Sequence, residues 1–165
     1  MKFFKLISLL FWTLRYLTFH QVLCRLLRIV RRKKDCFFNT NHLAIVIDKI
    51  RQAGGEVNIL SESSMQIKYS DKINATNLET MEYPGYPTDL QAQWMALMSI
   101  SKGNTSIKEN IYKDRFTHIS ELNRFGANIS FEDNVAFIKG VKSLKPAPVM
   151  STDIRASASL ILAAL

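Results

Sequence analysis

Two stretches of the chain carry residues that could do chemistry. PGYPTDLQAQWMALMSISKG spans residues 84–103, and KPAPVMSTDIRASASLILAAL spans residues 145–165. In each, prolines precede a Thr-Asp pair and an apolar segment follows. A carboxylate at the start of a helix can cap free N–H groups, and the helix dipole favours its ionised form. Asp89 in the first stretch would then be able to accept a proton.

The first stretch predicts a helix that begins at Thr88 or Asp89, either of which can cap it. Apolar residues recur at three- and four-residue steps, so one face should be buried: Leu90, Trp94, Leu97 and Met98. Gly103 is expected to end this helix. On local chemistry alone, a capped core helix explains the stretch.

The second stretch predicts another capped helix. Ser151, Thr152 and Asp153 can form its cap, and an Ala/Leu-rich segment follows. That segment is still apolar at Leu165, without a glycine or a basic last turn. The chain is therefore expected to be truncated there.

The basic charge is concentrated at the start of the chain. The sequence has 165 residues and a formal net charge of +8, with room for one domain or part of a larger one. Residues 1–40 hold nine Lys and Arg against one acid, which leaves 13 bases and 13 acids in residues 41–165. Residues 1–40 are therefore predicted to be an N-terminal arm, and residues 41–165 a separate body.

The arm is apolar, aromatic and basic at once. Its longest charge-free run, residues 6–14, is far shorter than the roughly 20 residues that span a bilayer, and Arg15 interrupts an otherwise signal-peptide-like start. A basic helix lying on a membrane surface through residues 1–34 is predicted. A helix packed on another part of the protein, or sequence joined by rearrangement, stays open. No nucleic-acid binding is expected, because only composition suggests it.

Cysteine usage points away from disulfides and metals. Cys24 and Cys36 lie in the arm, and no Cys/His spacing typical of a metal site occurs. No metal and no cofactor is predicted. The body is interpreted as cytosolic.

An internal repeat runs through the body, since residues 42–68 can be laid over residues 118–140. Each copy predicts a short helix that ends at a glycine, Gly54 or Gly126, as a left-handed C-cap requires. Two short strands with alternating apolar residues should follow each helix: Val57 and Ile59 with Met65 and Ile67, then Ile129 and Phe131 with Val135 and Phe137.

Helix and strand patterns also alternate between the two copies. Strands are expected at residues 75–81 and 105–111, on either side of the helix that Asp89 opens. His42 and His118 begin the repeat helices and are expected to be caps or partly buried structural residues. The body is therefore predicted to be α/β and built from copies of one helix–strand unit.

Three separated motifs in the body resemble one family: ETMEYPGYPTDLQAQWMAL, DRFTHISELNRFGANI and GVKSLKPAPVMSTDIRASASLILA. They resemble the MurA-type enolpyruvyl transferases, UDP-N-acetylglucosamine 1-carboxyvinyltransferase, over about residues 41–165. The resemblance implies part of an inverted α/β barrel of repeated helix–strand units, preceded here by the helical arm. It also implies transfer of enolpyruvyl from phosphoenolpyruvate to the 3-hydroxyl of UDP-N-acetylglucosamine, the first committed step of peptidoglycan synthesis.

The resemblance assigns roles to five residues. Asp89 matches the aspartate that contacts the sugar 3-hydroxyl and is proposed as the base. Ile111 matches a position whose backbone contacts the nucleotide sugar. Arg115 matches the family's arginine, for which a structural salt bridge and a substrate contact both stay open. Asp153 and Arg155 match an acid and a base that line the cleft; a helix cap with a solvated arginine is the alternative.

The resemblance is incomplete. Asp114 stands where the family usually has Asn, and Ser151 where it usually has Ala. The reactive-cysteine loop with its arginine, a Lys-Asn pair and a late arginine that holds phosphoenolpyruvate lie in segments absent here. Neither Cys24 nor Cys36 matches that cysteine. The chain is therefore expected to be a fragment with the sugar-side half of the site and negligible activity alone.

Two other interpretations stay open. One is a non-enzymatic, membrane-associated module that the arm anchors. The other is the shikimate-pathway enolpyruvyl transferase, against which the PTDLQAQ and TDIRASAS motifs speak. The predicted location is the cytoplasm, with peripheral membrane contact through the arm as a second possibility.

Overall fold

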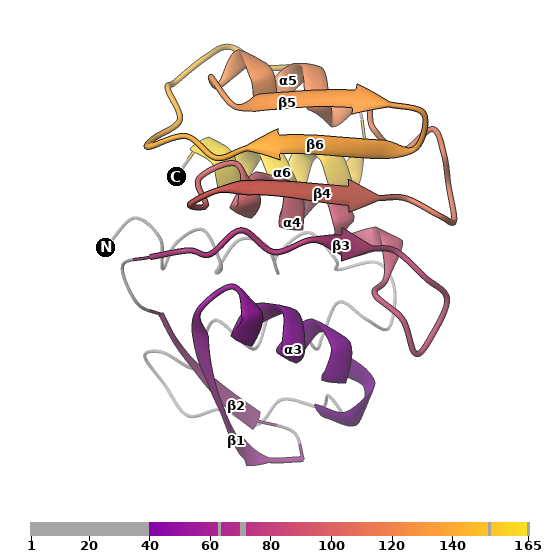
Figure 1. Ribbon diagram of the computed structural model, residues 1–165, viewed down its shortest axis with the longest axis vertical. Helices are drawn as coiled ribbons and strands as arrows, with labels where there is room; N and C mark the ends of the chain where they lie inside the picture. Colours follow the sequence, from indigo (N-terminus) through magenta and orange to yellow (C-terminus); the bar gives the residue numbers. More distant parts are fainter. Residues whose placement is uncertain (1–39, 63, 70–71, 152, 165) are drawn as a thin grey trace.

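The computed structural model describes residues 40–62, 64–69, 72–151 and 153–164. Its elements carry the labels of Figure 1, in which the helix numbers begin at α3. The predictions for the arm, including its membrane contact and its two cysteines, fall outside these residues. Within them, no helix combines the length and the apolar character needed to cross a membrane.

The predicted repeat is present as two helix–hairpin units. In each unit a short helix is followed by two strands that pair antiparallel. The first unit consists of the 3-10 helix η1 (Thr40–Leu43), α3 (Ala44–Gln52), β1 (Gly55–Ser61) and β2 (Ser64–Tyr69). The second consists of α5 (His118–Arg124), β5 (Asn128–Glu132) and β6 (Val135–Lys139). The α/β prediction is confirmed.

Both repeat helices end as predicted, at a glycine with positive φ. The φ angle is 98° at Gly54 and 85° at Gly126, in the left-handed region that glycine adopts without steric cost. After α5, the N–H of Gly126 bonds the carbonyl of Asn123, and the N–H of Ala127 bonds the carbonyl of Leu122. These two bonds form a Schellman motif, which turns the chain into β5.

A four-stranded sheet in the order β3-β4-β6-β5 joins the second unit to the middle of the chain. β3 (Leu78–Glu79) pairs parallel with β4 (Asn104–Lys108), and β4 pairs antiparallel with β6. Both strands are shorter than predicted. Behind this sheet lie α4 (Gln91–Met98) and α6 (Ile154–Ala164), which pack against each other (Figure 1). The starts of the two predicted capped helices are therefore brought together.

Helix α4 differs from its prediction in three ways. A 3-10 turn, η2 (Thr88–Leu90), precedes it, and it ends at Met98, so Gly103 does not end it. All eight of its residues are buried, including both glutamines, so it has no solvent-facing side. The sequence pattern identified the apolar face but not the burial of the rest, because the covering elements come from other parts of the chain.

The inward face of β6 is not the one that carries the alternating residues Val135 and Phe137 named in the sequence analysis. Ala136 and Ile138 are buried, whereas Phe137 is 48% exposed. Pairing explains this, because Ile138 lies opposite the buried Ile129 of β5 and the buried Thr105 of β4. An apolar run on a strand does not by itself say which of its two faces meets the core.

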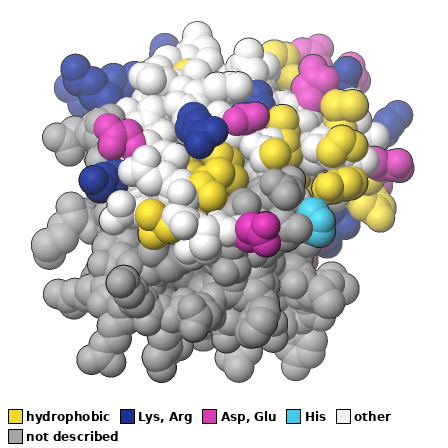
Figure 2. Space-filling model, turned by 90° about the horizontal axis from the view of Figure 1, so that it is seen from below, with side chains coloured by type: hydrophobic (Ala, Val, Ile, Leu, Met, Phe, Trp, Pro, Cys, Tyr) yellow, Lys and Arg dark blue, Asp and Glu magenta, His cyan; other side chains and the backbone are white. Residues whose placement is uncertain are grey.

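The described surface carries no broad field of one charge sign on the face seen in Figure 2. Acidic and basic side chains are interspersed there, and exposed apolar side chains gather towards one side. This agrees with the balance of 13 bases and 13 acids in residues 41–165. The described part of this face therefore shows no basic stripe of the kind that is typical of nucleic-acid binding.

Candidate functional site

Neither Thr88 nor Asp89 caps its helix, so this prediction is wrong. No side-chain cap bond is made at the start of η2 or of α4. The Thr88 hydroxyl donates to the Glu109 carboxylate instead, and Asp89 accepts from two arginines. Guanidinium groups compete successfully with backbone N–H groups, because hydrogen bonds between two charged groups are the stronger ones.

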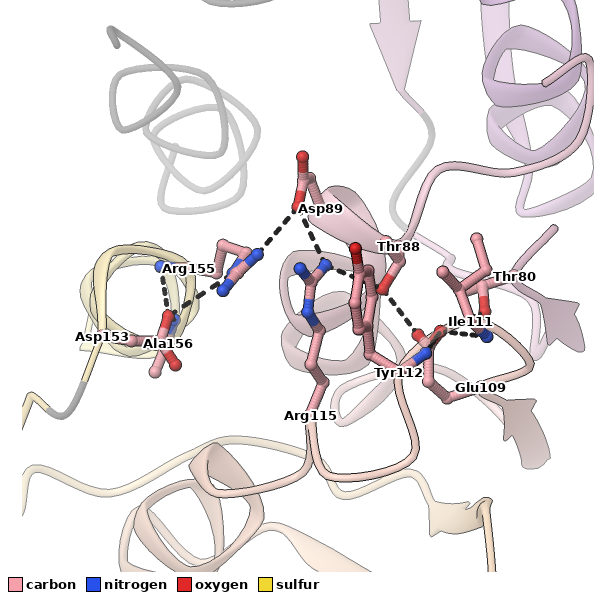
Figure 3. A network of polar contacts seen from close by, with 10 residues as sticks. All are labelled: Thr80, Thr88, Asp89, Glu109, Ile111, Tyr112, Arg115, Asp153, Arg155 and Ala156. Atoms are coloured by element: carbon pink, nitrogen blue, oxygen red, sulfur yellow. Dashed lines mark hydrogen bonds and ion pairs between the residues drawn. The ribbon is translucent and has the colours of Figure 1, made fainter. Parts of the chain in front are cut away.

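The Asp89 carboxylate lies between two arginines from distant parts of the chain. Arg115, in the loop after β4, and Arg155, in the first turn of α6, each place Nη1 3.0 Å from Oδ1 of Asp89. Oδ1 therefore accepts hydrogen bonds from both guanidinium groups. The second oxygen points away from both arginines (Figure 3), and the Asp89 side chain is 40% exposed.

The start of α6 is capped as predicted. Oδ1 of Asp153 accepts the N–H groups of Arg155 at 2.7 Å and of Ala156 at 3.0 Å. Burial pushes the pKa of Asp153 upward, but these N–H groups and the Arg155 guanidinium outweigh it and hold the pKa below its usual range. Arg155 is not a freely solvated arginine, because it reaches Asp89 while its Nε lies 3.7 Å from Asp153.

The backbone at Ile111 joins this group through a carboxylate that the sequence interpretation missed. Glu109 directly follows β4, is completely buried and accepts four hydrogen bonds. Its Oε1 takes the Thr80 hydroxyl at 2.7 Å and the N–H groups of Ile111 at 2.9 Å and Tyr112 at 3.1 Å. Its Oε2 takes the Thr88 hydroxyl at 2.9 Å.

The sequence did contain a clue to Glu109. Thr105, Ile107 and Glu109 alternate along the predicted strand, and all three are buried. An acidic residue on the inward face of a strand needs hydrogen-bond donors around it, because an unpaired buried charge is costly. A carboxylate in that register is therefore a candidate for a built polar site.

Arg115 is held from three sides. Besides its bond to Asp89, its Nη1 donates to the Thr88 hydroxyl at 3.1 Å, and its guanidinium carbon lies 3.9 Å from the centre of the Tyr112 ring. Thr88 thus accepts from Arg115 while it donates to Glu109 (Figure 3). The structure brings all five predicted residues into one connected network, four of them by direct side-chain contacts and Ile111 through Glu109.

The two repeat histidines are not caps. His42 is exposed, and its ring lies edge-on to Tyr83 at 6.0 Å. His118 is the first residue of α5 and is only 3% exposed, with no hydrogen-bond partner for Nε2. Burial lowers the pKa of His118 to about 4, against a smaller opposing effect of the Asp153 charge. His118 is thus a buried structural residue that is neutral at pH 7.

We expect the free energy of unfolding to fall as the pH is lowered from about 6.5 to 4. In this window His118 takes up a proton in the unfolded chain, where its pKa is about 6.5, but not in the folded one. The loss by pH 4 is on the order of 3 kcal/mol. Urea unfolding of the wild type and of His118→Leu, measured across this range, checks it.

The leucine variant should lose most of this pH dependence. His42→Gln, which changes an exposed histidine, serves as the matched control and should keep it. An equal slope in the wild type and in His118→Leu would assign the pH dependence to other groups.

In the part of the chain that the structure describes, no group of three or more His, Cys, Asp or Glu side chains could hold a metal ion. The candidate site is instead a row of carboxylates and guanidinium groups at two helix starts and one loop. Such a row can bind hydroxyl and anionic groups and accept a proton.

Sequence comparison decides the family. The protein-family model described as EPSP synthase (3-phosphoshikimate 1-carboxyvinyltransferase) matches residues 33–165. The chain belongs to the EPSP synthase family. Curated members of the family that resemble it are named UDP-N-acetylglucosamine 1-carboxyvinyltransferase. The protein of Geotalea daltonii is 52% identical over 124 residues, 75% of this chain and 30% of that protein. The Rickettsia bellii protein is 56% identical over 104 residues, 63% of this chain and 25% of that protein.

Two solved structures share the fold of this chain. The enolpyruvyl transferase NikO from Streptomyces tendae superposes with a TM-score of 0.62 at 26% identity, over 74% of this chain and 28% of that one. An EPSP synthase from Acinetobacter baumannii gives a TM-score of 0.51 at 14% identity, over 73% of this chain and 29% of that one. The latter supports the fold alone. This chain spans less than a third of the length of these relatives.

Proposed function

We propose that this chain binds the nucleotide sugar of an enolpyruvyl transferase, and that this sugar is UDP-N-acetylglucosamine. The transfer of enolpyruvyl from phosphoenolpyruvate to the sugar 3-hydroxyl is the proposed reaction. Support comes from the relatives of about 50% identity, whose shared name includes this sugar. The solved EPSP synthase, by contrast, is only 14% identical.

The free oxygen of Asp89 carries the proposal. Both arginines bond Oδ1, so Oδ2 is left to accept a hydrogen bond from a sugar hydroxyl. In this role Asp89 would take the hydroxyl proton as the oxygen attacks, which makes it the general base. Arg115 and Arg155 would fix the direction of the carboxylate, because each approaches it from a different element.

The loop after β4 would provide the second contact. The N–H of Ile111 is occupied by Glu109, so its carbonyl oxygen is the backbone group available to a ligand. Arg155 and Asp153, at the start of α6, would line the opposite side. The proposed site therefore uses one catalytic residue, Asp89, and four binding residues: Ile111, Arg115, Asp153 and Arg155.

Peptidoglycan synthesis and a cytoplasmic location belong to this proposal, since they follow from the resemblance. Phosphoenolpyruvate as the second substrate does so too. Contact of residues 1–34 with a membrane surface stays a separate prediction, as does the boundary between the arm and residues 41–165.

Isothermal titration of UDP-N-acetylglucosamine into the purified chain tests the proposal. We expect binding by the wild type, and about tenfold or greater weakening in Asp89→Asn, because a hydrogen bond to a charged group contributes about 1.5–3 kcal/mol. Asp133→Asn removes the same charge in the turn between β5 and β6, where φ is +53° and Asn is well tolerated. This control should bind like the wild type.

Two results would contradict the proposal. One is the absence of binding by a folded wild-type chain. The other is equal affinity in the wild type and in Asp89→Asn, which would place any nucleotide-sugar site elsewhere.

A further inference from the structure

The buried carboxylate of Glu109 has no direct contact with Asp89, yet hydrogen bonds connect the two. We propose that Glu109 is a positioning residue that orients Arg115 through the hydroxyl of Thr88. The inference rests on the proposed function only for the identity of the ligand. The chain of contacts itself runs from Oε2 of Glu109 to Thr88, and from Thr88 to Nη1 of Arg115.

The polarity of the Thr88 hydroxyl is the first step of the argument. A hydroxyl has one hydrogen to donate and lone pairs to accept with. A carboxylate has no hydrogen to donate, so Thr88 donates its single hydrogen to Glu109. The lone pairs of Thr88 then face Arg115, which can only donate.

The second step is the effect on Arg115. Its Nη1 has two hydrogens, and it uses them on Thr88 at 3.1 Å and on Asp89 at 3.0 Å. With both acceptors in place, the guanidinium has one orientation, in which it lies over the Tyr112 ring. Glu109 therefore fixes the direction from which Arg115 meets the Asp89 carboxylate.

The same carboxylate also fixes the loop. Its other oxygen, Oε1, takes the N–H groups of Ile111 and Tyr112, so the backbone proposed to contact the sugar and the ring beneath Arg115 depend on one residue. Among the described residues, Glu109 makes no ion pair. Its carboxylate is satisfied by four hydrogen bonds and not by an ion pair.

The variant Glu109→Gln distinguishes the roles of the two carboxylate oxygens. Oε1 serves three donors and Oε2 one, so the amide should keep its carbonyl at the Oε1 position and turn its NH2 towards Thr88. Thr88 must then accept from the amide, so its hydrogen loses its acceptor and the hydroxyl turns, which redirects the lone pair that it offers to Arg115. The variant should keep the loop but displace the guanidinium.

A double-mutant cycle tests this inference, with Glu109→Gln, Thr88→Val and the double variant. The first readout is the NMR signal of the Arg115 Nε–H in the free protein, and the second is the affinity for UDP-N-acetylglucosamine. We expect each single variant to shift the Arg115 signal and weaken binding about tenfold. The double variant should be no worse than Thr88→Val, because without the hydroxyl Glu109 has nothing to orient. Glu132→Gln, an exposed charge loss on β5, should match the wild type.

The inference fails if Glu109→Gln leaves the Arg115 signal unchanged, or if the two single effects multiply in the double variant. If Glu109→Gln does not fold, Thr88→Ser and Thr88→Val decide, since only the serine keeps the hydroxyl; equal Arg115 signals in both would overturn the relay. Absence of nucleotide-sugar binding by the wild type would contradict the proposed function alone, because the Arg115 signal is measured without ligand.

Discussion

Replacing Trp94 by alanine is expected to lower the free energy of unfolding by about 3–5 kcal/mol. Trp94 lies in α4, which is buried all round, and its own side chain is 2% exposed. Its ring packs at 6.0 Å against Tyr86, and its indole N–H bonds the carbonyl of Thr76 at 3.3 Å. The substitution removes this packing, opens a cavity and leaves a buried carbonyl unpaired.

Small domains have only about 5–15 kcal/mol of stability in total, so this substitution removes a large part of it. We expect it to disturb the candidate site as well as the core. Asp89 lies in the turn η2 directly before α4, so its place between the two arginines depends on this helix. Urea unfolding followed by circular dichroism measures the effect.

Trp94→Phe and Met81→Ala are the matched variants. The phenylalanine keeps an apolar ring and should cost clearly less than alanine. Met81 is 56% exposed, so its truncation should change stability by no more than about 0.5 kcal/mol. A Trp94→Ala protein as stable as Met81→Ala would mean that α4 is not the centre of the core.

Local patterns predicted the repeat units well, because each rests on residues close in sequence. Gly54 and Gly126 marked the helix ends, since only a residue without a Cβ accepts positive φ at no cost. The Asp153 cap was also predictable, because its carboxylate bonds N–H groups only two and three residues further along the chain, those of Arg155 and Ala156.

Contacts between distant residues could not be predicted from such patterns. Asp89 was expected to be a cap, yet it bonds Arg155, 66 residues away. The resemblance indicated that these two residues belong to one site, but the sharing of a single carboxylate oxygen depends on how α6 packs on α4. The face that β6 turns inward likewise depends on its partners in the sheet.

Glu109 falls between these cases. Its inward direction, directly after β4, was readable from the alternation with Thr105 and Ile107. Its donors were not, because Thr80 and Thr88 lie 29 and 21 residues earlier in the chain. Sequence reasoning finds such a residue only if it asks what satisfies a charge on an inward face.

Replacing Glu109 by alanine is the second large effect we expect, a loss of about 3–5 kcal/mol in the free energy of unfolding. The variant leaves the hydroxyls of Thr80 and Thr88 and the N–H groups of Ile111 and Tyr112 without their acceptor. Each unsatisfied buried group costs about 1–3 kcal/mol, and water can reach the two loop N–H groups in part, which keeps the sum below four full penalties.

Urea unfolding measures the total loss for Glu109→Ala, and amide hydrogen exchange shows where it falls. The N–H groups of Ile111 and Tyr112 should exchange faster, whereas those of α5, which Glu109 does not bond, should change only as far as global stability does. Glu132→Ala, on the exposed side of β5, is the control and should be nearly neutral. If Glu109→Ala matched it, the four bonds would contribute nothing net. If the variant kept its stability while the N–H groups of Ile111 and Tyr112 exchanged faster, Glu109 would order only the loop and would not contribute to global stability.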